Sequence, residues 1–303
     1  MTKESKYLIV IAGPTAAGKT ELAIQLAEQF NTVILSADSR QFYREMSIGT
    51  AKPNKEQLKR VKHYFIDTKH VDELYGAGHY EKDAIALLNE LFKHHRLVFL
   101  VGGSGLYINA VLNGVDDFIE VPEALRTELN HKFKEKGLQW LQQELKRKDE
   151  TYYDQVDLNN PQRIIRALEV CNFTGKPYSS FLKKNQNPRD FKTVPLLITP
   201  NRETLYKRIN ERVDDMMRRG LEDEVKSLRE HRHQNALKTV GYKELNAYFE
   251  GEINLKNAIE KIKQHSRNYA KRQLTWFRNQ GRFMEFAPDD IKAIKSYIQS
   301  VIE

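Results

Sequence analysis

The sequence is poor in cysteine and has no long apolar run. Its 303 residues include one cysteine, Cys171, which excludes an internal disulfide framework and any zinc site built from several cysteines. The longest apolar stretches, such as Leu97–Val101, are far too short to span a bilayer. The N-terminus also lacks the small-residue cleavage pattern of a signal peptide. We therefore expect a cytoplasmic protein that makes no membrane contact.

Acidic residues are the scarcer charge. The chain has 49 Lys and Arg against 41 Asp and Glu, a net charge of +8. A stretch near the C-terminus has basic and aromatic residues and no acidic one, which favours contact with the phosphates of a polyanion over a merely basic helix. Its members are Lys261, Lys263, Arg267, Lys271, Arg272, Arg278 and Arg282, interleaved with Tyr269, Trp276 and Phe277.

Short apolar runs alternate with helical patterns in the first hundred residues. This alternation predicts an α/β fold with a parallel sheet and right-handed crossovers. The expected strands are 7–12, 32–35, 97–101, 194–198 and 283–286, and the expected core helices are 20–29, 84–91, 105–112, 202–219 and 221–229.

The pattern between residues 118 and 187 is helical throughout. Helices are expected at 123–136, 138–147, 161–173 and 177–182. The simplest architecture is therefore an α/β core of residues 1–117 and 188–303, interrupted by an all-helical insertion domain at 118–187.

The strongest motif lies between the first strand and the first helix. It is Gly13-Pro14-Thr15-Ala16-Ala17-Gly18-Lys19-Thr20, which matches the phosphate-binding pattern G-x-x-x-x-G-K-[ST]. Backbone N–H groups of such a loop and the positive end of the next helix wrap an anion. Lys19 offers a positive charge to the phosphates, and the Thr20 hydroxyl is the expected ligand of a magnesium ion. A plain glycine-rich turn is the weaker alternative.

The motif predicts a phosphate ligand without saying which one. Most such loops bind nucleoside triphosphates, but the strand Leu97–Val101 ends in Gly102-Gly103-Ser104 and lacks the acidic residue that positions magnesium in standard ATPases. Only the second strand ends near a carboxylate, Asp38. A small-molecule kinase with Asp38 as base is one reading of this arrangement.

Several tracts, in order along most of the chain, resemble the bacterial tRNA dimethylallyltransferases (isopentenyltransferases). Each tract is weak alone, and the combination is highly specific. They are Gly13–Thr20, Ser36–Gln41 with Tyr43, Ile48–Pro53, Val101–Tyr107, Asn160–Arg163, Arg166–Val170, Val240–Glu244 and Lys271–Trp276.

The resemblance implies a core similar to P-loop nucleoside kinases, with the loop binding the diphosphate of dimethylallyl diphosphate. It implies transfer of the dimethylallyl group to the exocyclic N6 amine of the adenosine 3′ of the anticodon in tRNA, with Mg²⁺ as cofactor. The tRNA anticodon stem-loop and the allylic diphosphate are then the partners.

The resemblance also assigns roles to four residues. Asp38 is the expected general base, because a carboxylate that accepts a hydrogen from the poorly nucleophilic adenine amine makes it more reactive. Ser104 is expected to hydrogen-bond the bound nucleotide, and Lys19 and Arg212 to bind the diphosphate. The alternatives are a turn or N-cap for Asp38, a helix cap for Ser104 and a surface cation for Arg212.

Recognition of one base in a tRNA loop requires extrusion of that base and contacts to its edge. The positions that the resemblance assigns to tRNA are on both the core and the insert. An ordinary turn and helix start also accounts for the Asn-Asn-Pro sequence in the insert. The full set is Asp38, Ser39, Arg40, Gln41, Ser104, Arg126, Asn159, Asn160, Pro161, Gln162 and Arg163.

Three rival functions follow from the same residues. They are the P-loop small-molecule kinase, an adenylate isopentenyltransferase acting on free nucleotides, and a non-catalytic RNA-binding module. The helical insert and the basic stretch argue against a free nucleotide as acceptor, and the presence of Lys19, Thr20 and Asp38 argues against a module without catalysis. Nothing in the sequence requires a dimer, so a monomer is expected.

Overall fold

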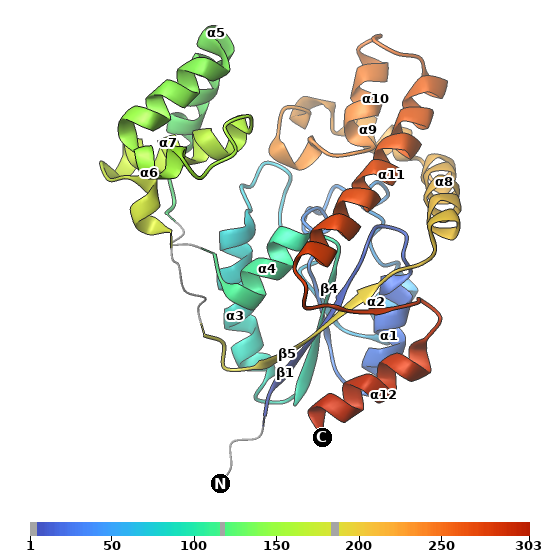
Figure 1. Ribbon diagram of the computed structural model, residues 1–303. Coiled ribbons are helices and arrows are strands. Elements are labelled where there is room, and N and C mark those ends of the chain that lie inside the picture. The colour runs from blue at the N-terminus through green and yellow to red at the C-terminus, as the bar shows by residue number, and fades with distance from the viewer. Residues whose placement is uncertain (1–4, 116–118, 183–187) are drawn as a thin grey trace. The chain divides into compact units, whose positions relative to one another are not determined.

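The computed structural model describes residues 5–115, 119–182 and 188–303, and the chain divides into two compact units (Figure 1). The first unit comprises Met1–Asn113 and Pro188–Glu303, and the second comprises Gly114–Asn187. The boundaries predicted for the insert, residues 118 and 187, lie outside the described residues. No helix in the described part of the chain is long and apolar enough to cross a membrane.

The first unit is built on a six-stranded sheet whose strand pairs are all parallel, in the order β3-β2-β4-β1-β5-β6. The α/β prediction is therefore confirmed. The strands are β1 (Tyr7–Ala12), β2 (Ile34–Ser36), β3 (His63–Tyr64), β4 (Leu97–Gly102), β5 (Lys192–Ile198) and β6 (Met284–Phe286).

Alternation along the central strand β1 places its side chains on both faces of the sheet. Leu8 and Val10 join one hydrophobic cluster, whereas Ile9 and Ile11 join another, and all four are fully buried. Because both faces of a parallel sheet are covered by helices, its central strands read as continuous apolar runs. This explains why the central strands were readable in the sequence.

Helices cover each face of the sheet (Figure 1). The first cluster contains apolar residues of α3 and α4, and the second those of α1 and α12. A third cluster is formed mainly by α8 to α11 and the segment after β2. The helices of this unit are α1 (Lys19–Gln29), α2 (Lys55–Arg60), α3 (Ala77–Leu91), α4 (Gly105–Asn113), α8 (Arg202–Arg218), α9 (Leu221–Ser227), α10 (Tyr242–Phe249), α11 (Leu255–Asn279) and α12 (Ile291–Ile302), with 3₁₀ turns at Arg229–His231 and Asn235–Leu237.

Some elements were not predicted. Strand β3 has two residues at the edge of the sheet, too few to show a period. Helix α3 begins at Ala77, earlier than expected. The backbone N–H of Gly76 donates to the His79 side chain, and this contact caps the helix one turn before its first buried residue, Tyr80.

The second unit is helical and has its own core. Its helices are α5 (Glu123–Lys148), α6 (Glu150–Tyr153) and α7 (Pro161–Thr174), followed by a 3₁₀ turn at Tyr178–Phe181. Gly137 breaks the helical backbone of α5 with φ 77°, so the two helices predicted on either side of it are confirmed. The helix expected at 177–182 is instead the short 3₁₀ turn.

Candidate active site

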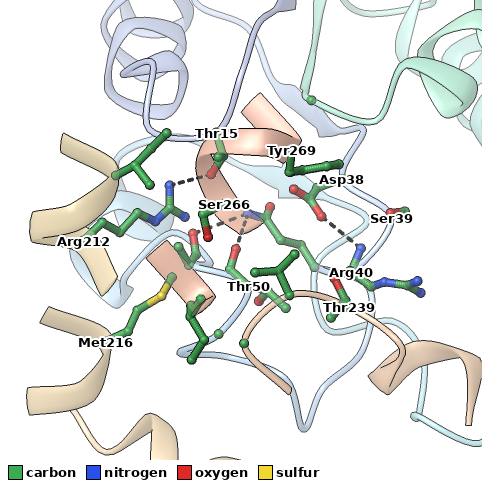
Figure 2. A pocket seen from close by; sticks show the side chains of 18 of the residues that line it. Thr15, Asp38, Ser39, Arg40, Thr50, Arg212, Met216, Thr239, Ser266 and Tyr269 are labelled. Carbon is green, nitrogen blue, oxygen red and sulfur yellow. Dashed lines mark hydrogen bonds between the residues drawn. The ribbon is translucent and has the colours of Figure 1, made fainter. Parts of the chain in front are cut away.

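A cavity of about 760 Å³ opens at the carboxyl ends of β1, β2 and β4. Ligand sites of open parallel sheets form at this edge, where the loops diverge. Its wall includes Lys19, Thr20, Asp38 and Arg212, which the sequence assigned to one site. Figure 2 shows Arg212 reaching towards Thr15 and Asp38 lying near Tyr269.

The phosphate-binding loop occupies the turn between β1 and α1. Two of its residues have left-handed backbones, Ala16 with φ 61° and Gly18 with φ 88°. A Cβ on Gly13 would lie 2.7 Å from the carbonyl oxygen of Ile198, so the start of the loop admits only glycine. This backbone presents the loop N–H groups and the first turn of α1 to an anion.

Two cations flank the loop. Lys19 Nζ donates to the carbonyl oxygen of Pro14 at 2.6 Å, and Arg212 Nη1 from α8 donates to Thr15 Oγ1 at 3.3 Å. Burial, and secondly the positive charge of Arg212, lower the pKa of Lys19 to about 7, while the Asp38 carboxylate opposes the shift. Burial also lowers the pKa of Arg212. Two partly buried cations on one cavity wall form a site for a polyanion.

Asp38 and Ser104 lie on the two loops that follow β2 and β4. Asp38 Oδ1 accepts from the backbone N–H of Arg40 at 2.9 Å, and Ser104 Oγ accepts from that of Ser39 at 2.9 Å. Burial, and secondly the Asp38 charge, raise the pKa of Tyr269 on α11 to about 12, so its hydroxyl stays protonated beside the carboxylate. Asp38 therefore stabilises a turn, as the alternative reading expected. Its Oδ2 makes no hydrogen bond in that turn and can accept one from a ligand.

The amide of Gln41 is occupied within the protein. Its Oε1 accepts from Ser36 Oγ at 2.9 Å, and its Nε2 lies 3.3 Å from the Thr50 carbonyl and 3.4 Å from that of Ala51. These contacts orient the segment 47–51, which forms part of the cavity wall. The expected use of this amide on a base edge therefore requires these bonds to be shared or exchanged.

Glu224 on α9 secures the same segment from outside. Its carboxylate accepts from the backbone N–H groups of Ser47, Ile48 and Gly49 at 2.9, 2.7 and 3.0 Å, and from the Tyr242 hydroxyl at 2.6 Å. A carboxylate that satisfies three consecutive backbone donors is a strong anchor.

We expect Glu224→Ala to lower the free energy of unfolding by about 2–3 kcal/mol, because it leaves those donors without their charged acceptor. Urea denaturation measures the change. Glu230→Ala, an exposed acidic residue nearby, is the control and is expected to change stability by less than about 0.5 kcal/mol. Equal stability of the two variants would contradict the anchoring role.

One part of the cavity wall is apolar. Ile209, Val213 and Met216 on α8 contribute to it, together with Leu221 and Ile262. Arg212 belongs to the same helix, so the cationic and apolar parts of the wall are continuous. Such a wall suits a small hydrocarbon attached to a phosphate group.

The described residues contain no group of three or more His, Cys, Asp or Glu side chains that could hold a metal ion by themselves. Magnesium commonly keeps several waters and takes one or two protein oxygens together with substrate phosphates. Thr20, the last residue of the phosphate-binding loop, lines the cavity, and its hydroxyl fits that kind of site.

The predicted tRNA contacts of the insert belong to the second unit, and the structure gives them internal partners. Arg126 pairs with the buried Glu169 through two hydrogen bonds of 2.5 and 3.0 Å, although nearly half of its side chain is exposed. Asn160 Oδ1 accepts from the backbone N–H of Arg163, with Pro161 in the first turn of α7. Asn159, Gln162 and Arg163 are largely exposed. The ordinary turn and helix start expected for the Asn-Asn-Pro sequence is therefore confirmed, and the contact of these residues with tRNA stays a prediction.

The basic stretch near the C-terminus runs along α11 and just beyond it. Four of its cations have partners within the protein: Lys263 with Asp214, Arg267 with Asn210, Arg278 with Glu285, and Arg282 with Asn109 and Asn113. Lys261, Lys271 and Arg272 are exposed, and the prediction of phosphate contacts rests on these three.

Two polar residues that support the site, Glu224 and Gln273, were not predicted individually from the sequence. Gln273 lies within the tract Lys271–Trp276 that carried part of the family resemblance. Its position in that tract could have indicated a functional role. Glu224 is one of three acidic residues in the first turn of α9. Acidic residues are common there because they stabilise the positive end of a helix, so nothing in the sequence indicated a further role for Glu224.

Comparisons with known proteins agree with this geometry. A family model described as IPP transferase matches residues 41–280. The chain is 49% identical over 299 residues to a tRNA dimethylallyltransferase of Christiangramia forsetii, covering 98% of this chain and 99% of that protein. It is 48% identical over 292 residues to tRNA dimethylallyltransferase 1 of Bacteroides thetaiotaomicron, covering 96% and 95%.

Solved structures give the same result. The tRNA isopentenylpyrophosphate transferase of Bacillus halodurans is similar with a TM-score of 0.72 at 38% identity, covering 99% of this chain and 97% of that one. A eukaryotic dimethylallyltransferase acting on tRNA has a TM-score of 0.77 at 25% identity, covering 95% and 75%.

Proposed function

Because the chain belongs to the IPP transferase family, we propose that it transfers the dimethylallyl group of dimethylallyl diphosphate to the N6 amine of the adenosine 3′ of the anticodon in tRNA, releasing diphosphate. The names of its relatives support tRNA as the acceptor. The observation that carries the proposal is that the phosphate-binding residue Lys19 and the carboxylate residue Asp38 line the same cavity.

The acceptor half of the reaction falls to Asp38. The adenine amine is a weak nucleophile because its lone pair is delocalised into the ring. Its nitrogen attacks the allylic carbon while a proton moves from that nitrogen to the Asp38 carboxylate, whose other oxygen is anchored by the Arg40 N–H. Tyr269 lines the same cavity and provides a polar group for the nucleotide. The buried Ser104, whose hydroxyl accepts from the Ser39 N–H, would have to exchange or share that bond to contact the nucleotide.

The donor half falls to the loop and its cations. As the allylic C–O bond breaks, its electrons pass to the diphosphate, whose growing negative charge is stabilised by Lys19, Arg212 and the loop N–H groups. The Thr20 hydroxyl would hold a magnesium ion, which would supply further positive charge to the leaving group. The apolar wall around Met216 accommodates the hydrocarbon.

Incubation with labelled dimethylallyl diphosphate, magnesium and unmodified tRNA tests the proposal. Label is expected in tRNA, on N6 of the adenosine 3′ of the anticodon after nuclease digestion. Parallel reactions with AMP as acceptor, and with ATP as donor towards nucleosides, test the two rival activities. Transfer to AMP but not to tRNA, or phosphate transfer from ATP without prenyl transfer, would refute it.

We also propose that the enzyme acts as a monomer in the cytoplasm. The relatives are named for a tRNA substrate, which is available in the cytoplasm, and the cavity brings the residues of both halves of the proposed reaction together within one copy of the chain. Light scattering at micromolar concentration, with and without tRNA, measures the stoichiometry.

A further inference from the structure

We infer that Gln273 is a positioning residue that joins the donor-binding loop to the acceptor-binding loop and sets the distance between the two substrates. The inference rests on the proposed function, because it assigns those loops to donor and acceptor.

The amide of Gln273 bridges two loops that are far apart in sequence. Its Oε1 accepts from the backbone N–H of Thr15 at 2.9 Å, and its Nε2 donates to the carbonyl oxygen of Gly103 at 2.8 Å. The side chain is 7% exposed, so both bonds are shielded from water. A buried amide with both ends satisfied has one orientation, and loss of either partner leaves a polar group without compensation.

The fit around this amide is tight. A Cβ on Gly103 would lie 2.3 Å from Gln273 Nε2, and one on Gly105 would lie 2.3 Å from the Trp276 ring, one turn further along α11. Helix α11 therefore packs against the loop after β4 at two glycines, where an added Cβ would displace Gln273 or Trp276.

Each end of the bridge leads directly to a group of the proposed reaction. Thr15 also accepts from Arg212, which flanks the diphosphate site. Gly103 precedes Ser104, whose hydroxyl accepts from the backbone N–H of Ser39 beside Asp38. An offset between the loops therefore becomes an offset between the allylic carbon and the amine, and a misplacement of about 1 Å costs about 100-fold in rate.

Gln273→Met is the main variant, because it keeps the length of the side chain and removes both hydrogen bonds. We expect its single-turnover transfer rate, with both substrates saturating, to fall about 10- to 100-fold. The Kd for inorganic diphosphate with magnesium is expected to change less than about 3-fold, because the loop N–H groups, Lys19 and Arg212 are retained. Gln264→Met, at an exposed position of the same helix, is the control and should transfer at the original rate.

Gly103→Ala disturbs the same contact from the other side. The two substitutions are expected to be non-additive, so that the double variant is no slower than the slower single variant. Gln273→Asn, whose shorter amide reaches one loop but not both, replaces Gln273→Met if that variant does not fold.

Hydrogen exchange separates failure of the inference from failure of the proposed function, since it requires no turnover. Backbone amides of 13–20 and of 102–105 should exchange faster together in Gln273→Met. The inference is overturned by a transfer rate within 2-fold of the original, by effects that multiply in the double variant, by loss of diphosphate binding in step with the rate, or by unchanged exchange at either loop.

Discussion

Asp38→Asn is expected to reduce the transfer rate by about 10²- to 10⁴-fold, the usual contribution of a general base. The side-chain oxygen of asparagine can still accept from the Arg40 N–H, so the turn after β2 is expected to keep its shape. The substitution removes the negative charge and the basic oxygen, and with them the proton acceptor for the adenine amine.

Single-turnover transfer at saturating donor and tRNA isolates this step. The Kd for inorganic diphosphate should change little, because Asp38 is not among the groups assigned to the donor. Asp72→Asn, a substitution of an exposed aspartate, is the matched control. A rate for Asp38→Asn close to that of the control would show that the proton leaves by another route.

Lys19→Met is expected to have opposite effects on donor binding and on stability. A hydrogen bond to a charged group contributes about 1.5–3 kcal/mol, so the affinity for diphosphate should fall about 10- to 100-fold. The free protein should unfold at a higher temperature, because burial and Arg212 disfavour the lysine charge that the variant removes.

The pH dependence of stability gives this prediction a sign. The folded-state pKa of Lys19 is about 7, against 10.5 for an ordinary lysine, so folding releases a proton between those values. The energetic cost of burying Lys19 therefore grows as pH falls from about 10 to about 7, and is constant below. The excess in Tm of Lys19→Met should follow the same course in thermal scans without metal or ligand.

Calorimetry of diphosphate binding provides the complementary measurement. Because the bound anion favours the charged lysine, binding at pH 8 should take up more protons in the original protein than in Lys19→Met. The difference, which excludes protons that diphosphate itself releases, is seen in how the observed heat depends on the ionisation enthalpy of the buffer. Lys93→Met, in an exposed part of the chain, is the control. Equal proton uptake by the original protein and Lys19→Met would mean that a group other than Lys19 titrates.

Local patterns made much of the fold predictable. The strands β1 and β4 are buried on both faces, and glycine lies at the carboxyl end of each, so a continuous apolar run before a glycine located them. The phosphate-binding loop needs glycines and a lysine at fixed spacing, which is again local information. The edge strand β3 is defined by its pairing with β2. It has only two residues, too few to show the alternation of apolar and polar residues that predicts a strand.

The contacts that complete the site are between distant parts of the chain. Thr15 and Gln273 are 258 residues apart, and Ser47 and Glu224 are 177 apart. Such pairs form only when α11 and α9 pack against the loops, so no local pattern in a single sequence predicts them. The same limit applies to Lys263, Arg267, Arg278 and Arg282, whose charge was evident in the sequence and whose internal partners were not.

The order of strands also determines when the core can be completed during synthesis. Strand β1 pairs with β4 on one side and with β5 on the other, and the whole helical unit, Gly114–Asn187, is encoded between those two partners. During synthesis, the edge of β1 that pairs with β5 therefore stays unpaired until the helical unit and β5 have been made. Open apolar edges invite pairing with other chains. We accordingly expect nascent or truncated chains that end before Ile198 to aggregate more readily than the full chain.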